Sequence, residues 1–237
     1  MKRHLDSYSG RLTAQQIAEG INAARRNARR LAEDAQLLFD RERYPTAAAL
    51  AILSIEETGK DSILREIAWS TGDKELRTSW KDFRSHTRKN TMWLLPKLVS
   101  EGARQLDDFR SLFEEEAEHT FLLDIIKQIS FYTDCLGKAH WSEPSDVIDK
   151  NLAKLLIDTA KIFLKDKEIT TKEVELWTKH MSPVRDKPPI EQKKALLNWY
   201  AELQEFGLTD ERHNIVDLLI WLGFSNDERV NFNSMLG

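Results

Sequence analysis

The sequence predicts an all-α protein, and three observations lead to this fold class. The chain of 237 residues holds only nine glycines and six prolines. No segment shows the alternating β-branched runs between turn signals that strands would need. Helical periodicity extends over most of the chain instead. We expect helices over residues 13–43, 45–69, 73–101, 104–131, 146–166, 171–180, 189–206, 210–222 and 226–235.

The first expected helix carries a long apolar seam. It should begin at Thr13, because Thr13 and Gln16 have the spacing of a capping box. Its apolar residues then repeat in a heptad pattern: Ile17, Ile21, Ala24, Ala28, Leu31, Ala35 and Leu38. The many alanines predict close packing against another helix. Tyr44-Pro45 supplies the break, since proline suits the first turn of a following helix.

The second expected helix places charges where a core should be. At ~100° per residue its isoleucines fall on one broad arc. Glu56 and Lys60 fall in the middle of that arc, with Glu57 towards its edge. The opposite side, expected to face solvent, carries Ser54, Thr58, Asp61 and Arg65. A charge on a buried stripe costs several kcal/mol unless it is paired, so these residues indicate a structural or chemical use.

Two interpretations of these charges stay open. Glu56 and Lys60 are spaced i, i+4 with the acid first, which is typical of an ordinary ion pair worth a few tenths of a kcal/mol. Alternatively, they form half of a site. Gly59 costs roughly 1 kcal/mol against alanine inside a helix, which indicates close approach of another segment.

A neighbouring helix could supply the other half of the site. A short turn at Gly72 would bring an antiparallel helix back beside the second helix, with Pro96 expected to kink it. Its polar side chains at comparable height are Lys81, Arg84, His86, Lys89 and Asn90. A histidine beside a carboxylate and a lysine can act as general acid or base. In the structural alternative, Glu56 and Glu57 merely neutralise the basic residues and fix the helix register.

Four segments together resemble the AbiV abortive-infection family, which is grouped with the HEPN superfamily. They are Asn27 to Ala35, Ala49 to Lys60, Phe83 to Lys89, and Tyr132-Thr133-Asp134 through Trp141 and Pro144. The resemblance covers about residues 15–150 and implies a HEPN-like antiparallel helical bundle with additional C-terminal helices. It also implies phage defence through arrest of the infected cell, often by blocking translation.

Many HEPN relatives are dimeric, metal-independent ribonucleases that use an Arg-x(4–6)-His pair. No arginine has that spacing here; the nearest analogue is Lys81, with four residues between it and His86. The resemblance therefore implies His86 as general acid or base, with Lys89 or Arg84 stabilising the phosphate, and Glu56 orienting His86 or Lys60. The possible supporting residues are Glu57, Lys81, Asn90, Tyr132 and Asp134. The alternative is a non-catalytic module that binds a phage or host protein.

Other charged groups give weaker candidate sites. The first helix carries two i, i+4 arginine pairs that could grip RNA or form a solvated face beside Glu33 and Asp34: Arg25, Arg26, Arg29 and Arg30. Glu116 and His119 form one Glu-x-x-His motif, whereas di-iron bundles need two copies. The nearest similar segment is residues 210–213. We expect no metal and no cofactor.

Composition gives expectations for the cellular location and the domain organisation. Net charge is −4, so no global positive field indicates nucleic-acid binding. One cysteine, Cys135, excludes an internal disulfide and a cysteine-based zinc site. Without an apolar signal region or a stretch of ~20 apolar residues, we expect a cytoplasmic protein that makes no membrane contact. We expect a main domain over 1–185 and a C-terminal extension over 186–237. The expected partners are a second copy, RNA or the translation machinery, and a phage-encoded activator.

Overall fold

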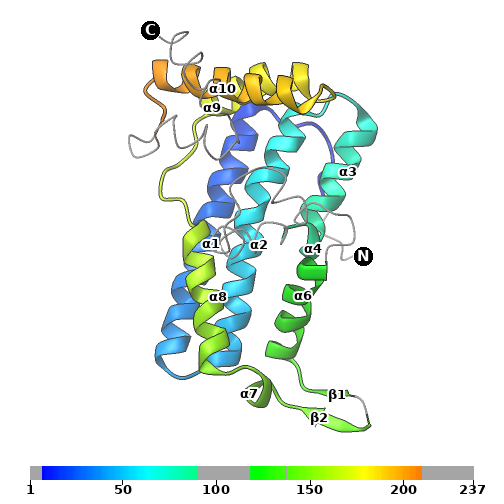
Figure 1. The fold of residues 1–237 in the computed structure, drawn as a ribbon, viewed down its shortest axis with the longest axis vertical. Helices are drawn as coiled ribbons and strands as arrows, with labels where there is room; N and C mark the ends of the chain where they lie inside the picture. Colours follow the sequence, from blue (N-terminus) through cyan, green and yellow to red (C-terminus); the bar gives the residue numbers. More distant parts are fainter. Residues whose placement is uncertain (1–6, 90–117, 137, 210–237) are drawn as a thin grey trace, which may run out of the picture.

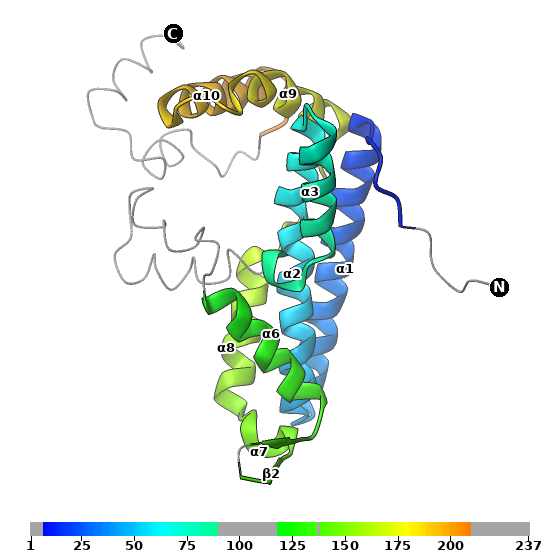
Figure 2. The ribbon, with the colours of Figure 1, turned by 90° about the vertical axis from the view of Figure 1, so that its right-hand side faces the viewer.

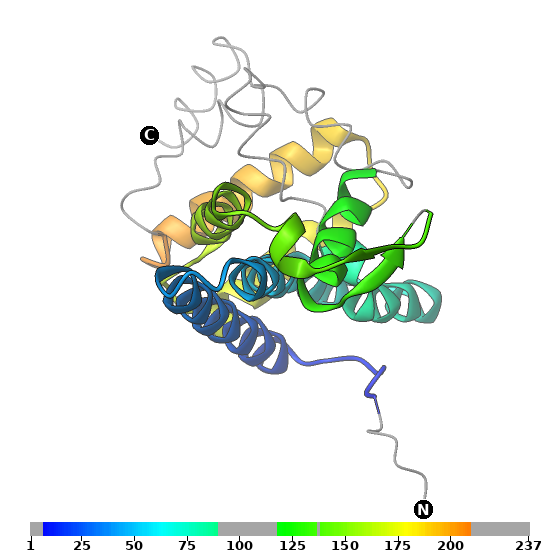
Figure 3. The same ribbon diagram turned by 90° about the horizontal axis from the view of Figure 1, so that it is seen from below.

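The computed structural model describes residues 7–89, 118–136 and 138–209, and its architecture is a helical bundle (Figure 1). Helix α1 (Ala14–Asp40) and helix α2 (Tyr44–Trp69) form a long antiparallel pair. Helix α2 is central, because it contacts α1, α3, α4, α6, α8 and α9. Seen from below, α1 lies on one side of α2, while α8 and α6 lie on the other (Figure 3). The all-α fold class is confirmed.

Helix α1 begins and packs as its sequence predicts. Thr13 is the N-cap, and both hydrogen bonds of the capping box with Gln16 are present. The seam residues from Ile17 to Ala35 are buried. They meet fully buried alanines of α2, among them Ala47, Ala48 and Ala51. Small side chains on both helices allow their backbones to approach closely, which sets the main axis of the bundle.

Helix α2 is buried over a wider arc than its sequence predicts. Pro45 stands in its first turn, as expected. Ser54 and Asp61, however, are buried rather than solvent-facing. Ser54 Oγ donates to the carbonyl of Ala28 in α1 at 2.8 Å. The expectation was wrong because α2 has neighbours on both sides, so its polar arc faces α1 instead of water.

The expected single helix over 73–101 is broken in its described part. Helix α3 spans Asp73–Arg84 and helix α4 spans His86–Lys89, with Ser85 between them in an extended conformation at ψ 130°. The break turns the chain, so that α4 lies against α2 (Figure 2). Pro96 lies outside the described residues.

The next described segment contains a small hairpin that sequence patterns did not predict. Helix α6 (Glu118–Phe131) leads into strands β1 (Asp134–Leu136) and β2 (His140–Ser142), which pair antiparallel. Three-residue strands are too short for a periodic signal, and the segment was expected to be a loop. Helices α7 (Pro144–Val147) and α8 (Lys150–Phe163) replace the single helix expected over 146–166, because Asp149 caps a new start.

The chain then crosses to the other end of the bundle. Residues 164–170 connect α8 to helix α9 (Thr171–Met181), whose predicted Thr170–Glu173 capping box is present. A short 3-10 turn, η2 (Ser182–Val184), precedes helix α10 (Pro189–Glu205). Helices α9 and α10 cross the end of the bundle together (Figure 1). The expected helices over 210–222 and 226–235 lie outside the described residues, so the division at residue 185 stays a prediction.

Two apolar cores lie one above the other along the α1–α2 pair. One joins α2 with α8 and α6 around Ile52, Ile55 and Leu123. The other joins α1 and α2 with α3 and α9 around Ile21, Leu64 and Val174. Among the described helices, none is long and apolar enough to cross a membrane.

Candidate functional site

The candidate site is built around Glu56, a carboxylate of α2 whose side chain is only 3 % exposed. Its oxygen Oε2 lies 2.7 Å from Nδ1 of His86, which is the first residue of α4. Its other oxygen, Oε1, accepts a hydrogen bond from Nζ of Lys127 in α6 at 2.6 Å. Three helices far apart in sequence therefore meet at one carboxylate. The expectation that Glu56 points inward towards another helix agrees with this geometry.

Lys127 is a buried cation with two acidic partners. Its side chain is 7 % exposed, and its Nζ lies 2.8 Å from Asp124 as well as 2.6 Å from Glu56. Burial alone would lower the pKa of Lys127, but the hydrogen bonds to Asp124 and Glu56 outweigh it and raise that pKa above its ordinary value. Lys127 therefore stays charged at neutral pH and holds Glu56 in place.

His86 is the part of this cluster that solvent reaches. Its side chain is 57 % exposed although Nδ1 faces the buried carboxylate, so the opposite ring edge, which carries Nε2, lies on the open side. Of the two neutral tautomers of an imidazole, a carboxylate at Nδ1 favours the one that carries its proton on that nitrogen. Nε2 is then free to accept a proton, which is the arrangement that orients a catalytic histidine as a general base.

Gly59 makes room for α4 beside α2. A Cβ at this position would lie 2.1 Å from the carbonyl oxygen of Lys89, well inside any allowed contact. The close approach expected from the sequence is therefore present, and the approaching segment is the α4 backbone. The glycine thus places His86 within reach of Glu56 and buries Lys89 beside the same carboxylate.

Lys89 is a second buried cation at the site. Burial lowers its pKa below the ordinary value, although the nearby carboxylates of Glu56 and Glu57 oppose that shift. Lys60 pairs with Glu57 at 2.5 Å and also lies over the ring of Phe83, 5.2 Å from its centroid. The i, i+4 pair of Glu56 with Lys60 does not form, because His86 and Lys127 occupy both oxygens of Glu56.

Several expected site residues lie elsewhere. Arg84 is directed away from Glu56: it donates to the carbonyls of Trp80 and Tyr8 and lies over the Trp80 ring. Lys81 is exposed on α3. Tyr132 and Asp134 are exposed at the hairpin, which lies at the end of the bundle away from α4 (Figure 2). Asn90 lies outside the described residues.

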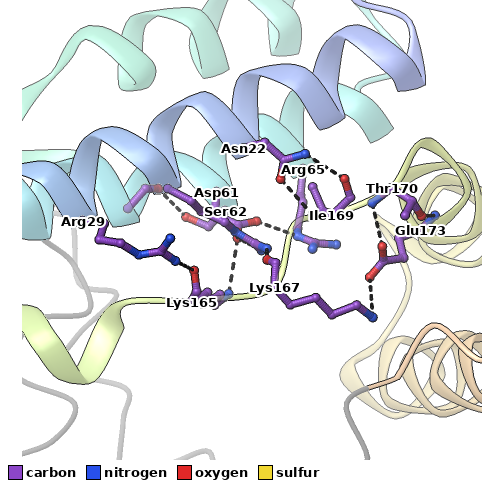
Figure 4. Close-up of polar contacts among 12 residues, drawn as sticks. Asn22, Arg29, Asp61, Ser62, Arg65, Lys165, Lys167, Ile169, Thr170 and Glu173 are labelled. Atoms are coloured by element: carbon purple, nitrogen blue, oxygen red, sulfur yellow. Dashed lines mark hydrogen bonds and ion pairs between the residues drawn. The ribbon is translucent and has the colours of Figure 1, made fainter.

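Three arginines of α1, Arg25, Arg26 and Arg29, contact the connection between α8 and α9, and Figure 4 shows this contact at Arg29. Arg29 donates to the Lys165 carbonyl and to Asp166, and Arg26 pairs with Glu168 at 2.7 Å. One turn away, Asn22 exchanges two hydrogen bonds with the backbone of Ile169. In the described part of the chain, this arginine face thus holds residues 164–170 against α1, and we call this set of contacts the clamp.

Arg25 and Asp61 form the buried centre of that clamp. Arg25 donates to Asp61 at 2.5 Å and to the carbonyl of Lys167 at 2.7 Å. Burial would raise the pKa of Asp61, but Lys165, Arg65 and Arg25 hold it far below its ordinary value. Arg30 instead pairs with Asp34 at 3.0 Å on its own helix, as the sequence spacing indicates.

Metal ligands do not gather in the described part of the chain. There, no group of three or more histidine, cysteine, aspartate or glutamate side chains is placed to hold an ion. Glu116 and residues 210–213, which carry the expected Glu-x-x-His form and its echo, lie outside the described residues.

Sequence reasoning missed Lys127 and Asp124. A signal was present, because Leu123, Lys127 and Ser130 are spaced i, i+4, i+7 and all three are buried. A lysine in the middle of a buried helical stripe is the same signal that marked Glu56 on α2.

Comparison with known proteins and families identifies the family of this chain. No curated protein and no solved structure matches it at a significant level. The family model HEPN_AbiV, described as AbiV, matches residues 16–165, which is well over half of the chain. The match contains α1, α2, α4, α6 and α8, including Glu56, His86 and Lys127. The chain therefore belongs to the AbiV family of the HEPN-like group.

Proposed function

We propose that this protein acts in phage defence by abortive infection, arresting the growth of infected cells through metal-independent cleavage of RNA. One observation supports the chemistry above others: an exposed imidazole, His86, is held at Nδ1 by the buried carboxylate of Glu56 at 2.7 Å. Membership of the AbiV family supports the biological role. The proposed assembly is a homodimer, and the proposed target is RNA or the translation machinery.

The geometry fits the first step of RNA cleavage by the 2′-hydroxyl. Nε2 of His86 would take the proton of that hydroxyl while its oxygen attacks the adjacent phosphorus. The bond between phosphorus and the 5′-oxygen then breaks, the leaving oxygen takes a proton from water, and His86 releases the proton that it took to the solvent. The products are a 2′,3′-cyclic phosphate and a 5′-hydroxyl. Lys89 and Lys60 are the proposed source of positive charge near the phosphate.

Arg84 is not part of this proposal. Its guanidinium is bonded to the backbone of Trp80 and Tyr8, so it cannot present a bidentate fork to a phosphate at Glu56. Lysine can stabilise the extra charge of the transition state as a point charge, and two lysines flank the glutamates of α2. Of the two residues that the family resemblance implied for the phosphate, Lys89 and Arg84, the proposed chemistry therefore relies on Lys89.

A second candidate function is a non-catalytic module that binds a phage or host protein. It is favoured by exposed apolar side chains on α6, the helix that carries Lys127: Phe121, Leu122 and Ile125. In this alternative the Glu56 cluster would fix the register of α2, α4 and α6 and nothing more. A phage-encoded activator could bind the same helix in either case.

Substitution of His86 separates the two candidates. His86→Ala should abolish growth arrest and leave cellular RNA intact, because the exposed base is lost while the core is untouched. His140→Ala, at an exposed histidine of the hairpin, is the matched control and should behave as wild type. His140→Ala should melt at the wild-type temperature, and His86→Ala, which takes one partner from the buried Glu56, should melt lower but remain folded at the assay temperature. Arrest by His86→Ala with intact RNA would rule out the nuclease and leave the binding module.

A further inference from the structure

We propose that Lys127 is the positioning residue of this site: it holds one oxygen of Glu56 and so fixes the carboxylate in the orientation in which the other oxygen meets Nδ1 of His86. Glu56 then keeps the proton of the neutral imidazole on Nδ1, with Nε2 as the acceptor. Only the catalytic consequence rests on the proposed function. The tautomer itself can be measured in the resting protein, so the two ideas can fail separately.

The two hydrogen bonds fix the orientation of the Glu56 carboxylate. The terminal torsion of a glutamate is broad, so a carboxylate with one partner can rotate. Here Oε1 is held by Lys127 at 2.6 Å and Oε2 lies 2.7 Å from His86 Nδ1. The partners belong to α6 and α4, which contact α2. Rotation would break one of the two bonds in a place that water does not reach.

Lys127 is itself held in place and stays charged. Asp124, one turn earlier on α6, lies 2.8 Å from its ammonium group. Among the described residues, the other charges near this cluster are Lys89 of α4, which interacts with Glu56, and the Glu57–Lys60 pair of α2. Lys60 is bonded to Glu57 at 2.5 Å and so does not compete for Glu56. Lys127 thus holds the carboxylate of Glu56 in the orientation that meets His86.

In Glu56→Gln, the same geometry predicts that the imidazole proton of His86 moves from Nδ1 to Nε2, which can be measured. Lys127 can only donate, so it would keep the amide oxygen of Gln at its ammonium group. The amide nitrogen, a donor, would then face Nδ1 of His86. To accept that bond, His86 must carry its proton on Nε2 instead of Nδ1. Nitrogen-15 NMR of the ring should show Nδ1–H in the wild-type protein and Nε2–H in Glu56→Gln.

The double variant Glu56→Gln with Lys127→Met tests the role of Lys127 directly. Without the ammonium group the amide can flip, so the preference for Nε2–H should be lost. The same inversion in the single and double variants would overturn the proposal, because Lys127 would then have no influence. Retention of Nδ1–H in Glu56→Gln would overturn it as well.

Single substitutions of Lys127 give a second readout that needs no change at Glu56. Lys127→Met should lower RNA cleavage about 10- to 100-fold, the loss typical when the support of a functional histidine is removed. Lys127→Arg, which keeps the charge, should restore most of it. Lys154→Met is the matched control: Lys154 is an exposed lysine that pairs with Asp158 at 2.7 Å on α8. Wild-type cleavage by a folded Lys127→Met protein would contradict the positioning role.

Discussion

Gly59→Ala is the sharpest test of how α4 is placed against α2. The added Cβ would lie 2.1 Å from the carbonyl oxygen of Lys89, while real Cβ atoms keep at least 3.0 Å. The obstacle is backbone rather than a flexible side chain, so α4 must retreat by about 1 Å. A retreat of that size would stretch the 2.7 Å contact between His86 and Glu56 towards the ~3.5 Å limit of a hydrogen bond.

Two opposing effects decide the stability of Gly59→Ala. Overpacking of this kind costs about 1–3 kcal/mol. Alanine returns about 1 kcal/mol of helix propensity. The free energy of unfolding should therefore fall by roughly 0–2 kcal/mol. Activity should fall more strongly, because the His86–Glu56 geometry is lost.

Gly20→Ala in α1 is the matched control. Its Cβ would meet only a methyl group of Leu64 at 3.4 Å, an ordinary contact, so the helix propensity gain should appear as a stabilisation of up to ~1 kcal/mol. Urea denaturation of both variants, with the ring signals of His86, measures the difference. If Gly59→Ala is stabilised as much as Gly20→Ala and the His86 signals are unchanged, α4 does not pack against Gly59.

Three further predictions concern the buried charges. Asp61→Asn should destabilise by about 3–5 kcal/mol at neutral pH, because three cations lose a buried partner. Since the pKa of Asp61 is lowered in the folded state, its contribution to the free energy of unfolding is present above the unfolded-state pKa of ~3.9 and is lost as pH falls below that value. Urea unfolding between pH 2 and 7 should therefore show that acid lowers the free energy of unfolding less in Asp61→Asn than in the wild type. The same dependence on pH in both proteins would contradict this linkage. Lys89→Met should raise the free energy of unfolding, because burial disfavours the charged form of this lysine, while cleavage falls. A lower free energy of unfolding would show that Lys89 is structural. Arg26→Ala should lower the free energy of unfolding by less than ~1 kcal/mol, because its pair with Glu168 is exposed. Arg25→Ala should lower it by about 3 kcal/mol or more, because Asp61 stays buried with one partner fewer. Thermal unfolding of the two variants decides whether the clamp depends on its buried pair.

Local signals in the sequence predicted the local structure well. The capping boxes at Thr13 and Thr170, the break at Tyr44-Pro45 and the close approach at Gly59 are all present. Each was signalled by a single residue or by residues at most three apart in sequence. Capping, ring geometry and the absence of a side chain act through nearby atoms, which explains why these predictions hold without knowledge of the fold.

Predictions that depended on neighbouring helices were less complete. Periodicity on α2 marked Glu56 as inward-facing, but it assigned Asp61 to solvent, because one helix cannot show how many neighbours surround it. Lys60 pairs with Glu57 rather than with Glu56, because Glu56 accepts a hydrogen bond from Lys127 of α6, which is 71 residues away in the sequence. The arginine face of α1 has its main partners in residues 165–168, which only the path of the chain after α8 brings there.

We propose that His86, held by Glu56, cleaves RNA by activating a 2′-hydroxyl, and mapping of RNA ends in growth-arrested cells is the most direct test. We expect new 2′,3′-cyclic phosphate and 5′-hydroxyl ends in cells that carry the wild-type or His140→Ala protein, and none in cells that carry His86→Ala. Arrested wild-type cells without such ends, or the same ends with His86→Ala, would contradict it.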